Sequence, residues 1–277
     1  MKMSFNFLKI AFLGPQGTNS HLAMNEIFGE KITPFPLKNI HSIFHQVESG
    51  EADFGVVPIE NSTEGAVTYT FDELIDTSLV IVAEKFIKIS CCFLSKSSDF
   101  FKIKRIYSHP QPIAQCKNWL QANFKETEII FSESTSKAAE IVSKDSKAAA
   151  IASDLAAKIY GLNILAENIE DYENNYTRFF AIGKEKDKQK PSGHDKTSIV
   201  CSVKDKPSAL LKLLKPFDET QINMTKIESR PNKKKNWEYN FFIDFLGHQD
   251  DQIVKKALQE MQTEALFLKV LGSYPRG

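Results

Sequence analysis

Short apolar runs alternate with helical stretches along the first 183 residues of the chain. The run FLKIAFLG ends at Gly14–Pro15, and the following TNSHLAMNEIFG has the apolar spacing of a helix capped by Thr18 or Ser20. Strand-like runs recur as DFGVVPIE, LVIVAEKFIKISCCFLS, IKRIYSHPQ, EIIFSE and AAAIAS. This alternation predicts an α/β region of mostly parallel sheets, in which ligands are bound at the carboxyl ends of the strands.

A different pattern follows the charged segment KEKDKQKPSGHDK (residues 184–196), which lacks apolar periodicity and is typical of a linker. The strand-like TSIVCSVK precedes the helical PSALLKLLKPFDE and two further strands, INMTKIESR and NWEYNFFIDFLG. A helix near DQIVKKALQEM and a last strand, ALFLKVLG, complete the region. The order βαββαβ predicts a ferredoxin-like domain over residues 197–274.

The composition is that of an ordinary globular protein, with 42% hydrophobic and 25% charged residues. The 35 Lys and Arg residues balance 35 Asp and Glu residues, which argues against a nucleic acid or an anionic membrane as partner. No apolar run approaches the ~20 residues of a membrane span. The N-terminal MKMSFNFLKIAFLG lacks the features of a signal peptide, so we expect a cytoplasmic protein.

The four cysteines are Cys91, Cys92, Cys116 and Cys201. They form no CxxC pair and no histidine cluster accompanies them, so the sequence predicts no zinc site. We expect buried, reduced thiols of a cytoplasmic protein.

Polar segments follow two of the predicted strands. GPQGTNS (14–20) places backbone N–H groups and hydroxyls at a helix N-terminus, as an anion site or as a simple capped turn. PIENSTEG (58–65) places Asn61, Ser62 and Thr63 after a buried strand, as a binding loop or as an N-cap and turn. Glu60 is either a general acid or a group that holds this loop through backbone N–H groups.

Two other polar segments have weaker chemical signals. His109 in SHPQPIAQC precedes a proline, and such a histidine is more often a turn residue than a titrating catalytic group. The hydroxyls of SESTSKAAE (132–140) mainly indicate helix capping.

Thr177 and Arg178 lie side by side in the otherwise apolar strand NNYTRFFAIG (174–183). An arginine is almost never buried unless it is paired. Arg178 therefore either pairs with an upstream acid, Asp171 or Glu173, or binds an anionic ligand. A guanidinium is a planar, bidentate fork for a carboxylate, and the adjacent hydroxyl adds a directional donor, so the pair favours an anion site.

Taken in this order, GPQGTNS, PIENSTEG, the SHPQ segment and NYTRF resemble the motifs of the prephenate dehydratase family, over essentially the whole chain. PSALLKLL and IESRP resemble the effector segments of an ACT regulatory domain. The resemblance implies a catalytic domain over residues 7–183, with two α/β lobes similar to periplasmic binding proteins and an active site in their cleft. The lobes are expected to span roughly 7–80 with 180–183, and 81–179. No chorismate mutase domain is expected ahead of residue 7.

The implied reaction is the decarboxylative dehydration of prephenate to phenylpyruvate in L-phenylalanine biosynthesis, by a carbon–oxygen lyase that needs no metal or cofactor. Thr177 is expected to hydrogen-bond the departing hydroxyl and to protonate it directly or through a relay. Arg178 is expected to bind a substrate carboxylate. The other implied substrate-binding residues are Thr18, Asn19, Ser20, Asn61, Ser62 and Phe179.

The ACT resemblance implies feedback regulation by L-phenylalanine. The implied effector-binding residues are Ser208, Ala209, Leu210, Asn223, Glu228 and Ser229. Because ACT domains usually pair side by side, we expect a homodimer or a dimer of dimers.

Two positions depart from the family pattern. Asn19 replaces the usual aromatic residue of the first motif, which bears on the shape of the cleft. Ser208 replaces the glycine that usually precedes Ala-Leu, and glycine permits a close approach of ligand to backbone. Effector affinity therefore follows less directly from the resemblance than catalysis does.

Two other functions fit the same motifs. Arogenate dehydratase performs the same reaction on the transaminated substrate, and the two substrates differ in one amino group. A non-catalytic protein that senses amino acids would use the same cleft and ACT domain, although the intact YTRF motif disfavours it.

Overall fold

The computed structural model describes residues 7–172, 174–232 and 238–277. The chain divides into two compact units. Unit 1 joins the residues up to Thr70 with Lys85–Phe179, and unit 2 joins Phe71–Glu84 with Phe180–Gly277. None of the helices in the described part of the chain combines the length and apolar character that a bilayer crossing needs.

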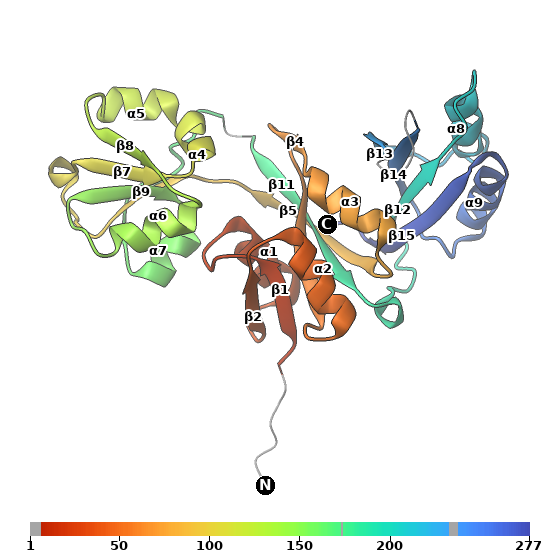
Figure 1. The fold of residues 1–277 in the computed structure, drawn as a ribbon, viewed down its shortest axis with the longest axis horizontal. Helices are drawn as coiled ribbons and strands as arrows, with labels where there is room; N and C mark the ends of the chain where they lie inside the picture. The colour runs from red at the N-terminus through yellow and green to blue at the C-terminus, as the bar shows by residue number, and fades with distance from the viewer. Residues whose placement is uncertain (1–6, 173, 233–237) are drawn as a thin grey trace, which may run out of the picture. The chain divides into compact units, whose positions relative to one another are not determined.

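The first sheet is built from the N-terminal third of the chain and one later strand. Its elements are β1 (Lys9–Leu13), α1 (Asn19–Phe28), β2 (Thr33–Leu37), α2 (Ile40–Ser49), β3 (Phe54–Asn61), β4 (Gly65–Ala66), α3 (Thr68–Asp76), β5 (Val80–Lys88) and β11 (Tyr176–Gly183). The strand order is β2-β1-β3-β11-β5, and β4 pairs with β3. β1 runs parallel to β2 and β3, because α1 and α2 provide the crossover connections (Figure 1). The chain passes from one unit to the other within α3, β5 and β11.

The second sheet lies wholly in unit 1. Its elements are β6 (Cys92–Ser95), the 3₁₀ turn η1 (Phe100–Lys102), β7 (Arg105–Ser108), α4 (Pro110–Gln115), α5 (Lys117–Asn123), β8 (Glu128–Phe131), α6 (Thr135–Val142), β9 (Ala148–Ala152), α7 (Asp154–Tyr160) and β10 (Asn163–Ala166). The strand order is β10-β6-β9-β7-β8. Helices α4 and α5 cover one face, and α6 and α7 cover the other (Figure 1).

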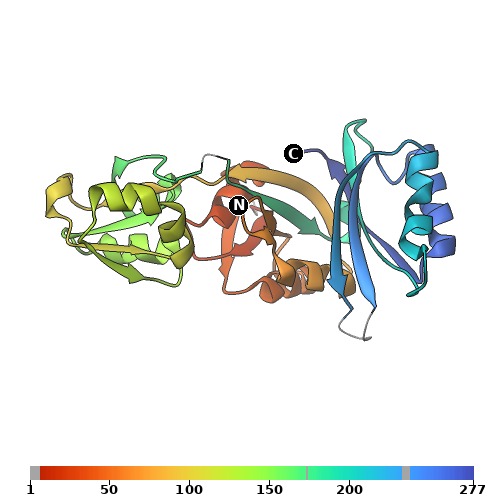
Figure 2. The ribbon, with the colours of Figure 1, turned by 90° about the horizontal axis from the view of Figure 1, so that it is seen from above.

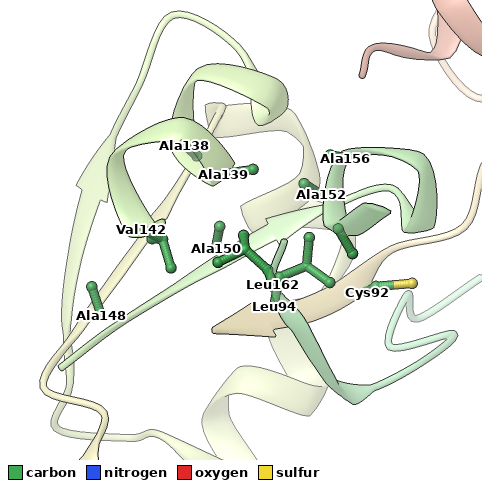
Figure 3. Packing of buried hydrophobic residues seen from close by; sticks show 11 residues of the cluster. Cys92, Leu94, Ala138, Ala139, Val142, Ala148, Ala150, Ala152, Ala156 and Leu162 are labelled. Atoms are coloured by element: carbon green, nitrogen blue, oxygen red, sulfur yellow. The ribbon is translucent and has the colours of Figure 1, made fainter. Parts of the chain in front are cut away.

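Strand β9 is buried on both faces because successive side chains of a strand point to opposite sides. Ala149 and Ile151 pack with Phe93 beneath α4 and α5. The other three alanines of β9 face α6 and α7 in a cluster of mostly small side chains (Figure 3). Small residues on strand and helices let the two layers approach closely, so this segment packs without large side chains.

The C-terminal region forms the predicted ferredoxin-like domain. After the 3₁₀ turn η2 (Glu185–Asp187) come β12 (Asp195–Ser202), α8 (Ala209–Glu219), β13 (Met224–Pro231), β14 (Tyr239–Leu246), α9 (Gln252–Glu264) and β15 (Phe267–Pro275). The antiparallel sheet has the order β13-β14-β12-β15, and both helices cover one of its faces (Figure 2). The order βαββαβ is confirmed. Residues 236 and 237, at the start of the alternating pattern, lie outside the described residues.

Three sequence expectations change. Residues 81–88 and 176–179, predicted for the second lobe, belong to the first sheet. LVIVAEKFIKISCCFLS forms two strands, β5 and β6, in different sheets, and β11 begins at Tyr176. The second sheet is mixed instead of mostly parallel, since β6 pairs antiparallel with β9 and β10. The expected linker contains η2 and the first two residues of β12, where the Asp195 carboxylate accepts the N–H groups of Ser192 and Gly193 at 2.7 and 3.1 Å.

Candidate active site

Asn61 and Thr177 meet where β3 ends and β11 begins. The side-chain amide of Asn61 donates from Nδ2 to Thr177 Oγ1 and to Asn175 Oδ1, each at 2.8 Å. Ser62 binds the same stretch, because its N–H donates to the Tyr176 carbonyl at 2.8 Å and its hydroxyl accepts the Tyr176 N–H at 2.9 Å. These bonds bring together Asn61, Ser62 and Thr177, three of the residues predicted from the sequence.

Thr18 caps α1, as predicted. Its Oγ1 accepts the His21 N–H at 3.4 Å and donates to the Leu13 carbonyl at 3.0 Å. Asn19 and Ser20 are the first two residues of the helix, half-buried and buried respectively. The first N–H groups of a helix lack an intrahelical partner, so this helix start is suited to an anion.

The loop before α1 is held against the helices of the second sheet. The Gln16 and Gly17 carbonyls accept the hydroxyls of Ser136 and Ser153, the latter at 3.0 Å. Gly17 has φ +85°, and a Cβ there would lie 2.9 Å from Ser136 Oγ, so the position favours glycine. His21 Nδ1 accepts the Gly17 N–H at 3.0 Å, and burial lowers the pKa of His21, which keeps its ring a neutral acceptor.

Phe179 lies in the apolar core and not at a ligand surface. It is 2% exposed and packs with Phe12, Met24 and Val56. Its assignment as a substrate-binding residue is therefore corrected: it fills the layer beneath α1. Thr177, two positions earlier on β11, points to the same face of the strand as Phe179. The Thr177 hydroxyl thus lies on the face that α1 covers, at the end of its strand.

Arg178 is 3% exposed and is paired within the protein. Its Nη1 donates to Glu60 Oε1 at 3.0 Å, and its guanidinium lies 5.7 Å from the centroid of the Phe86 ring. The interpretation that substrate neutralises Arg178 is therefore corrected, because the end of β3 supplies the counter-charge. Successive residues of a strand point to opposite faces, so Arg178 and Thr177 do not share a surface.

Of the two upstream acids, Asp171 has a different partner. The Asp171 carboxylate accepts the Asn118 N–H at 3.1 and 3.2 Å. Glu173 lies outside the described residues.

The weaker candidates are helix caps. His109 caps α4, where its Nδ1 accepts the Gln111 N–H at 3.4 Å. Ser134 caps α6 by accepting the Lys137 N–H at 3.0 Å. Both match the simpler interpretation of their segments.

The predicted effector residues lie at both ends of α8. Ser208 is the N-cap, in the left-handed conformation with φ +63°, and Ala209 and Leu210 line a pocket of about 170 Å³. Ser229 pairs across the sheet with Phe241, which lines the same pocket. Asn223 instead lines a pocket of about 550 Å³ near the end of α8. The six residue steps from Asn223 to Ser229 span about 20 Å in an extended strand, so a single chain does not bring all six predicted effector residues together.

Glu228 is the remaining predicted effector residue. It is half-buried on β13, and its carboxylate lies 3.9 Å from Lys226 Nζ.

All four cysteines are free and buried, as predicted. Burial raises the pKa of Cys92 and of Cys201 to about 12, so both thiols stay protonated at neutral pH. A hydrogen bond with Cys91, together with burial, raises the pKa of Cys116. Across the described residues, no group of three His, Cys, Asp or Glu side chains gathers as metal ligands.

Sequence reasoning missed one residue of this network. Asn175 is 2% exposed and its Oδ1 accepts the Asn61 amide. The signal available was the pair of asparagines that opens NNYTRFFAIG, since a buried amide requires partners. The sequence left Glu60 open between a general acid and a group that holds the loop, and the structure pairs its carboxylate with Arg178.

Comparison with known proteins adds to this geometry. The family description "Prephenate dehydratase" matches residues 10–187, and "ACT domain" matches residues 197–261. A bifunctional chorismate mutase/prephenate dehydratase of Aquifex aeolicus is 47% identical over 97% of this chain and 74% of its own length. The prephenate dehydratase of Methanocaldococcus jannaschii is 39% identical over 94% of this chain and 96% of its own length.

A solved structure extends the likeness to three dimensions. The prephenate dehydratase of Arthrobacter aurescens, crystallised with L-Phe, has a TM-score of 0.89 and 34% identity, and the match covers 97% of this chain and 90% of that one. The mixed α/β region and the four-stranded antiparallel domain agree with both family matches. The chain belongs to the prephenate dehydratase family and carries an ACT domain at its C-terminal end.

Proposed function

We propose that this chain converts prephenate to phenylpyruvate, water and carbon dioxide, as a carbon–oxygen lyase regulated by L-phenylalanine. The observation that carries the proposal is the Thr177 hydroxyl, which Asn61 holds at the start of β11 in a chain of this family. Thr177 lies on the face covered by α1, whose N-terminus is suited to an anion.

The reaction needs orientation and one proton. The C–O bond to the ring hydroxyl breaks as that oxygen takes a proton, and the electrons of the ring-to-carboxylate bond move into the ring as carbon dioxide leaves. Aromatisation supplies the driving force. Thr177 donates a hydrogen bond to the departing oxygen, and correct placement of the reacting groups alone contributes several kcal/mol to such a step.

The substrate carboxylates are held by the start of α1, with Thr18 and Ser20 as the nearest hydroxyls. Asn19, at the first helical position, contributes its side chain to this surface. Arg178 acts indirectly: through Glu60 it ties the start of β11 to the end of β3, and so keeps Thr177 in place.

Turnover of prephenate by the purified full chain tests this function. Phenylpyruvate absorbs in alkali, and we expect it to form from prephenate. A parallel reaction with arogenate, followed as phenylalanine, decides between the two substrates. A chain that binds amino acids and turns over neither substrate would be the non-catalytic sensor instead.

Thr177→Val tests the assigned donor, because valine keeps the shape and removes the hydroxyl. Loss of one positioned donor typically lowers kcat by ~10²–10³. Thr263→Val, on the exposed side of α9, is the matched control and should keep wild-type turnover. A Thr177→Val enzyme within about tenfold of wild type would remove Thr177 from the mechanism.

L-Phenylalanine is expected to bind where the ACT domains of two copies meet. The predicted effector residues lie at opposite ends of α8. In a dimer, the residues at the start of α8 in one copy would lie beside those near the end of α8 in the other copy. Coupling of this kind is typically worth ~1–3 kcal/mol. Calorimetry and turnover across a phenylalanine titration should give binding and inhibition together. The absence of both at millimolar phenylalanine would refute the regulatory role.

A further inference from the structure

The side-chain amide of Asn61 has a partner on both of its polar atoms. On one side Nδ2 donates to Thr177 Oγ1 and Asn175 Oδ1. On the other side Oδ1 accepts the backbone N–H groups of Thr63 at 3.0 Å and Glu64 at 3.1 Å. The Thr63 hydroxyl donates to the same oxygen at 2.6 Å.

The backbone decides which way this amide points. Thr63 N–H and Glu64 N–H are donors only, so they require an acceptor, and a flipped amide would present its NH₂ group to them. The oxygen of Asn61 must therefore face the loop. The NH₂ group is left to face β11, where Thr177 lies.

The direction of the Thr177 proton follows from this orientation. A hydroxyl has one donor and two acceptor positions, and an amide NH₂ can only donate. Thr177 Oγ1 thus accepts from Asn61, and its own O–H must donate in another direction. The hydroxyl therefore does not donate its proton to the Asn61 amide.

We propose that Asn61 is a positioning residue that sets the donor direction of the Thr177 hydroxyl toward the departing oxygen of the substrate. This inference rests on the proposed function and deepens it. It replaces the sequence assignment of Asn61 as a substrate-binding residue: Asn61 acts through Thr177. The two residues are 116 positions apart in the chain.

Asn61→Asp tests the direction of the bond with almost no change in shape. One carboxylate oxygen still accepts from Thr63 and Glu64, but the other now accepts from Thr177 and turns its proton away from substrate. We expect kcat for prephenate to fall by ~10² or more at neutral pH, approaching the Thr177→Val value, with a smaller change in KM. Thr177→Val with Asn61→Asp should be no slower than Thr177→Val alone.

The pH profile separates this role from a structural one. When the carboxyl introduced by Asn61→Asp is protonated, its O–H can donate to Thr177 as the amide did. The kcat of this variant, relative to wild type at the same pH, should therefore rise as the pH is lowered toward the ordinary carboxyl range near ~4. Asn123→Asp, the same change on the exposed face of α5, should follow the wild-type profile throughout.

Asn61→Ala provides a second readout, also if Asn61→Asp unfolds at neutral pH. Alanine leaves the hydroxyl undirected, whereas aspartate misdirects it, so neutral-pH turnover should rank wild type, then Ala, then Asp. If Asn61 only held the loop, the Asp variant should be faster than the Ala variant, because Ala loses the bonds to Thr63 and Glu64 that Asp keeps. Where Asn61→Asp is unfolded, the inference requires Ala to stay above Thr177→Val in kcat.

The outcomes separate the two proposals. No phenylpyruvate from the wild-type chain refutes the function, and an active Thr177→Val refutes the donor and this inference with it. If wild type is active and Thr177→Val is not, then three results each refute the inference alone. The first is a wild-type kcat for Asn61→Asp, and the second is a reduced kcat of Asn61→Asp that does not recover relative to wild type at low pH. The third is an Asn61→Ala variant that is slower than Asn61→Asp.

Discussion

Residues 61–65 and 71–84 are near neighbours in the sequence, yet different interactions hold them, each within its own unit. In unit 1 the segment Asn61–Gly65 is largely exposed, and hydrogen bonds from Asn61 and Ser62 tie it to the start of β11. In unit 2 the segment Phe71–Glu84 is held by packing and charge against the ACT sheet. The rings of Phe71 and Phe242 pack edge to face with their centroids 4.7 Å apart. The buried carboxylate of Glu84 accepts a hydrogen bond from Lys196 Nζ at 2.7 Å.

The ACT strand β15 adds two further contacts to the packed segment. Lys269 Nζ donates to the carbonyls of Leu74 and Ile75 at 3.0 and 3.2 Å, near the end of α3. A cation at a helix C-terminus interacts favourably with the helix dipole. Gly272 lies so close to Ile81 that an added Cβ would be 2.2 Å from the Ile81 carbonyl oxygen.

The comparison shows two ways of fixing a segment. Exposed hydrogen bonds can be exchanged for bonds to a ligand at small cost, because water and ligand offer similar partners. A close-packed interface has little free space, so a change that overfills it typically costs ~1–3 kcal/mol and occasionally more. The loop at Asn61 is held in the first way, and the segment packed against the ACT sheet is held in the second.

Gly272→Ala should break the packed segment and give the largest effect. The new Cβ overlaps backbone, which cannot move aside as a flexible side chain can, so we expect the free energy of unfolding to fall by about 3 kcal/mol or more. Denaturant unfolding of the full chain measures this loss. Gly193→Ala is the control, because it has φ +84° and no atom within 4 Å of the added Cβ. It should cost only about 1 kcal/mol from backbone conformation, and equal losses would contradict the packing account.

Arg178→Met should weaken the hydrogen-bonded edge by a smaller amount. It removes the guanidinium that pairs with Glu60, whose side chain is 26% exposed, and the expected loss of unfolding free energy is about 2 kcal/mol. Arg105→Met is the matched control. Arg105 forms an ion pair with Asp145 at 2.7 Å, and the two side chains are more exposed than the Arg178 pair, at 42% for Arg105 and 30% for Asp145. That variant should lose no more than about 1 kcal/mol. Similar losses in the two variants would mean that burial adds nothing to the Arg178 pair.

Ser208→Gly should give the smallest effect, and in the opposite direction. The start of α8 belongs to neither kind of segment, since Ser208 is exposed, left-handed and makes no side-chain capping bond. Glycine relieves the left-handed conformation but makes the unfolded chain more flexible, so stability should rise by about 0.5–1 kcal/mol. Ser208→Ala keeps the conformational cost and should lie within about 0.5 kcal/mol of wild type. A Gly variant no more stable than the Ala variant would contradict this account.

The element order of the ACT domain and the start of α1 could be predicted from the sequence alone, whereas β2, α2 and β10 were not predicted. Apolar spacing and turn residues predicted α1 with its Thr18 cap and the βαββαβ order of the ACT domain, because these signals are local. The motifs also predicted that Asn61, Ser62 and Thr177 belong to one site. The error at β5 arose because a continuous apolar run does not indicate that the chain changes sheets at Ser90 and Cys91.

Partner choice was decided by the tertiary structure. Arg178 had nearby acids in the sequence but pairs with Glu60, 118 positions away, and Phe179 follows Thr177 and Arg178 but is buried in the core. The direction of the Asn61–Thr177 bond likewise depends on two backbone N–H groups that only the folded loop places at the Asn61 oxygen. A linear pattern indicates which groups need a partner. Which partner each one meets depends on the pairing of distant strands, and that pairing is settled by the packing of the whole chain.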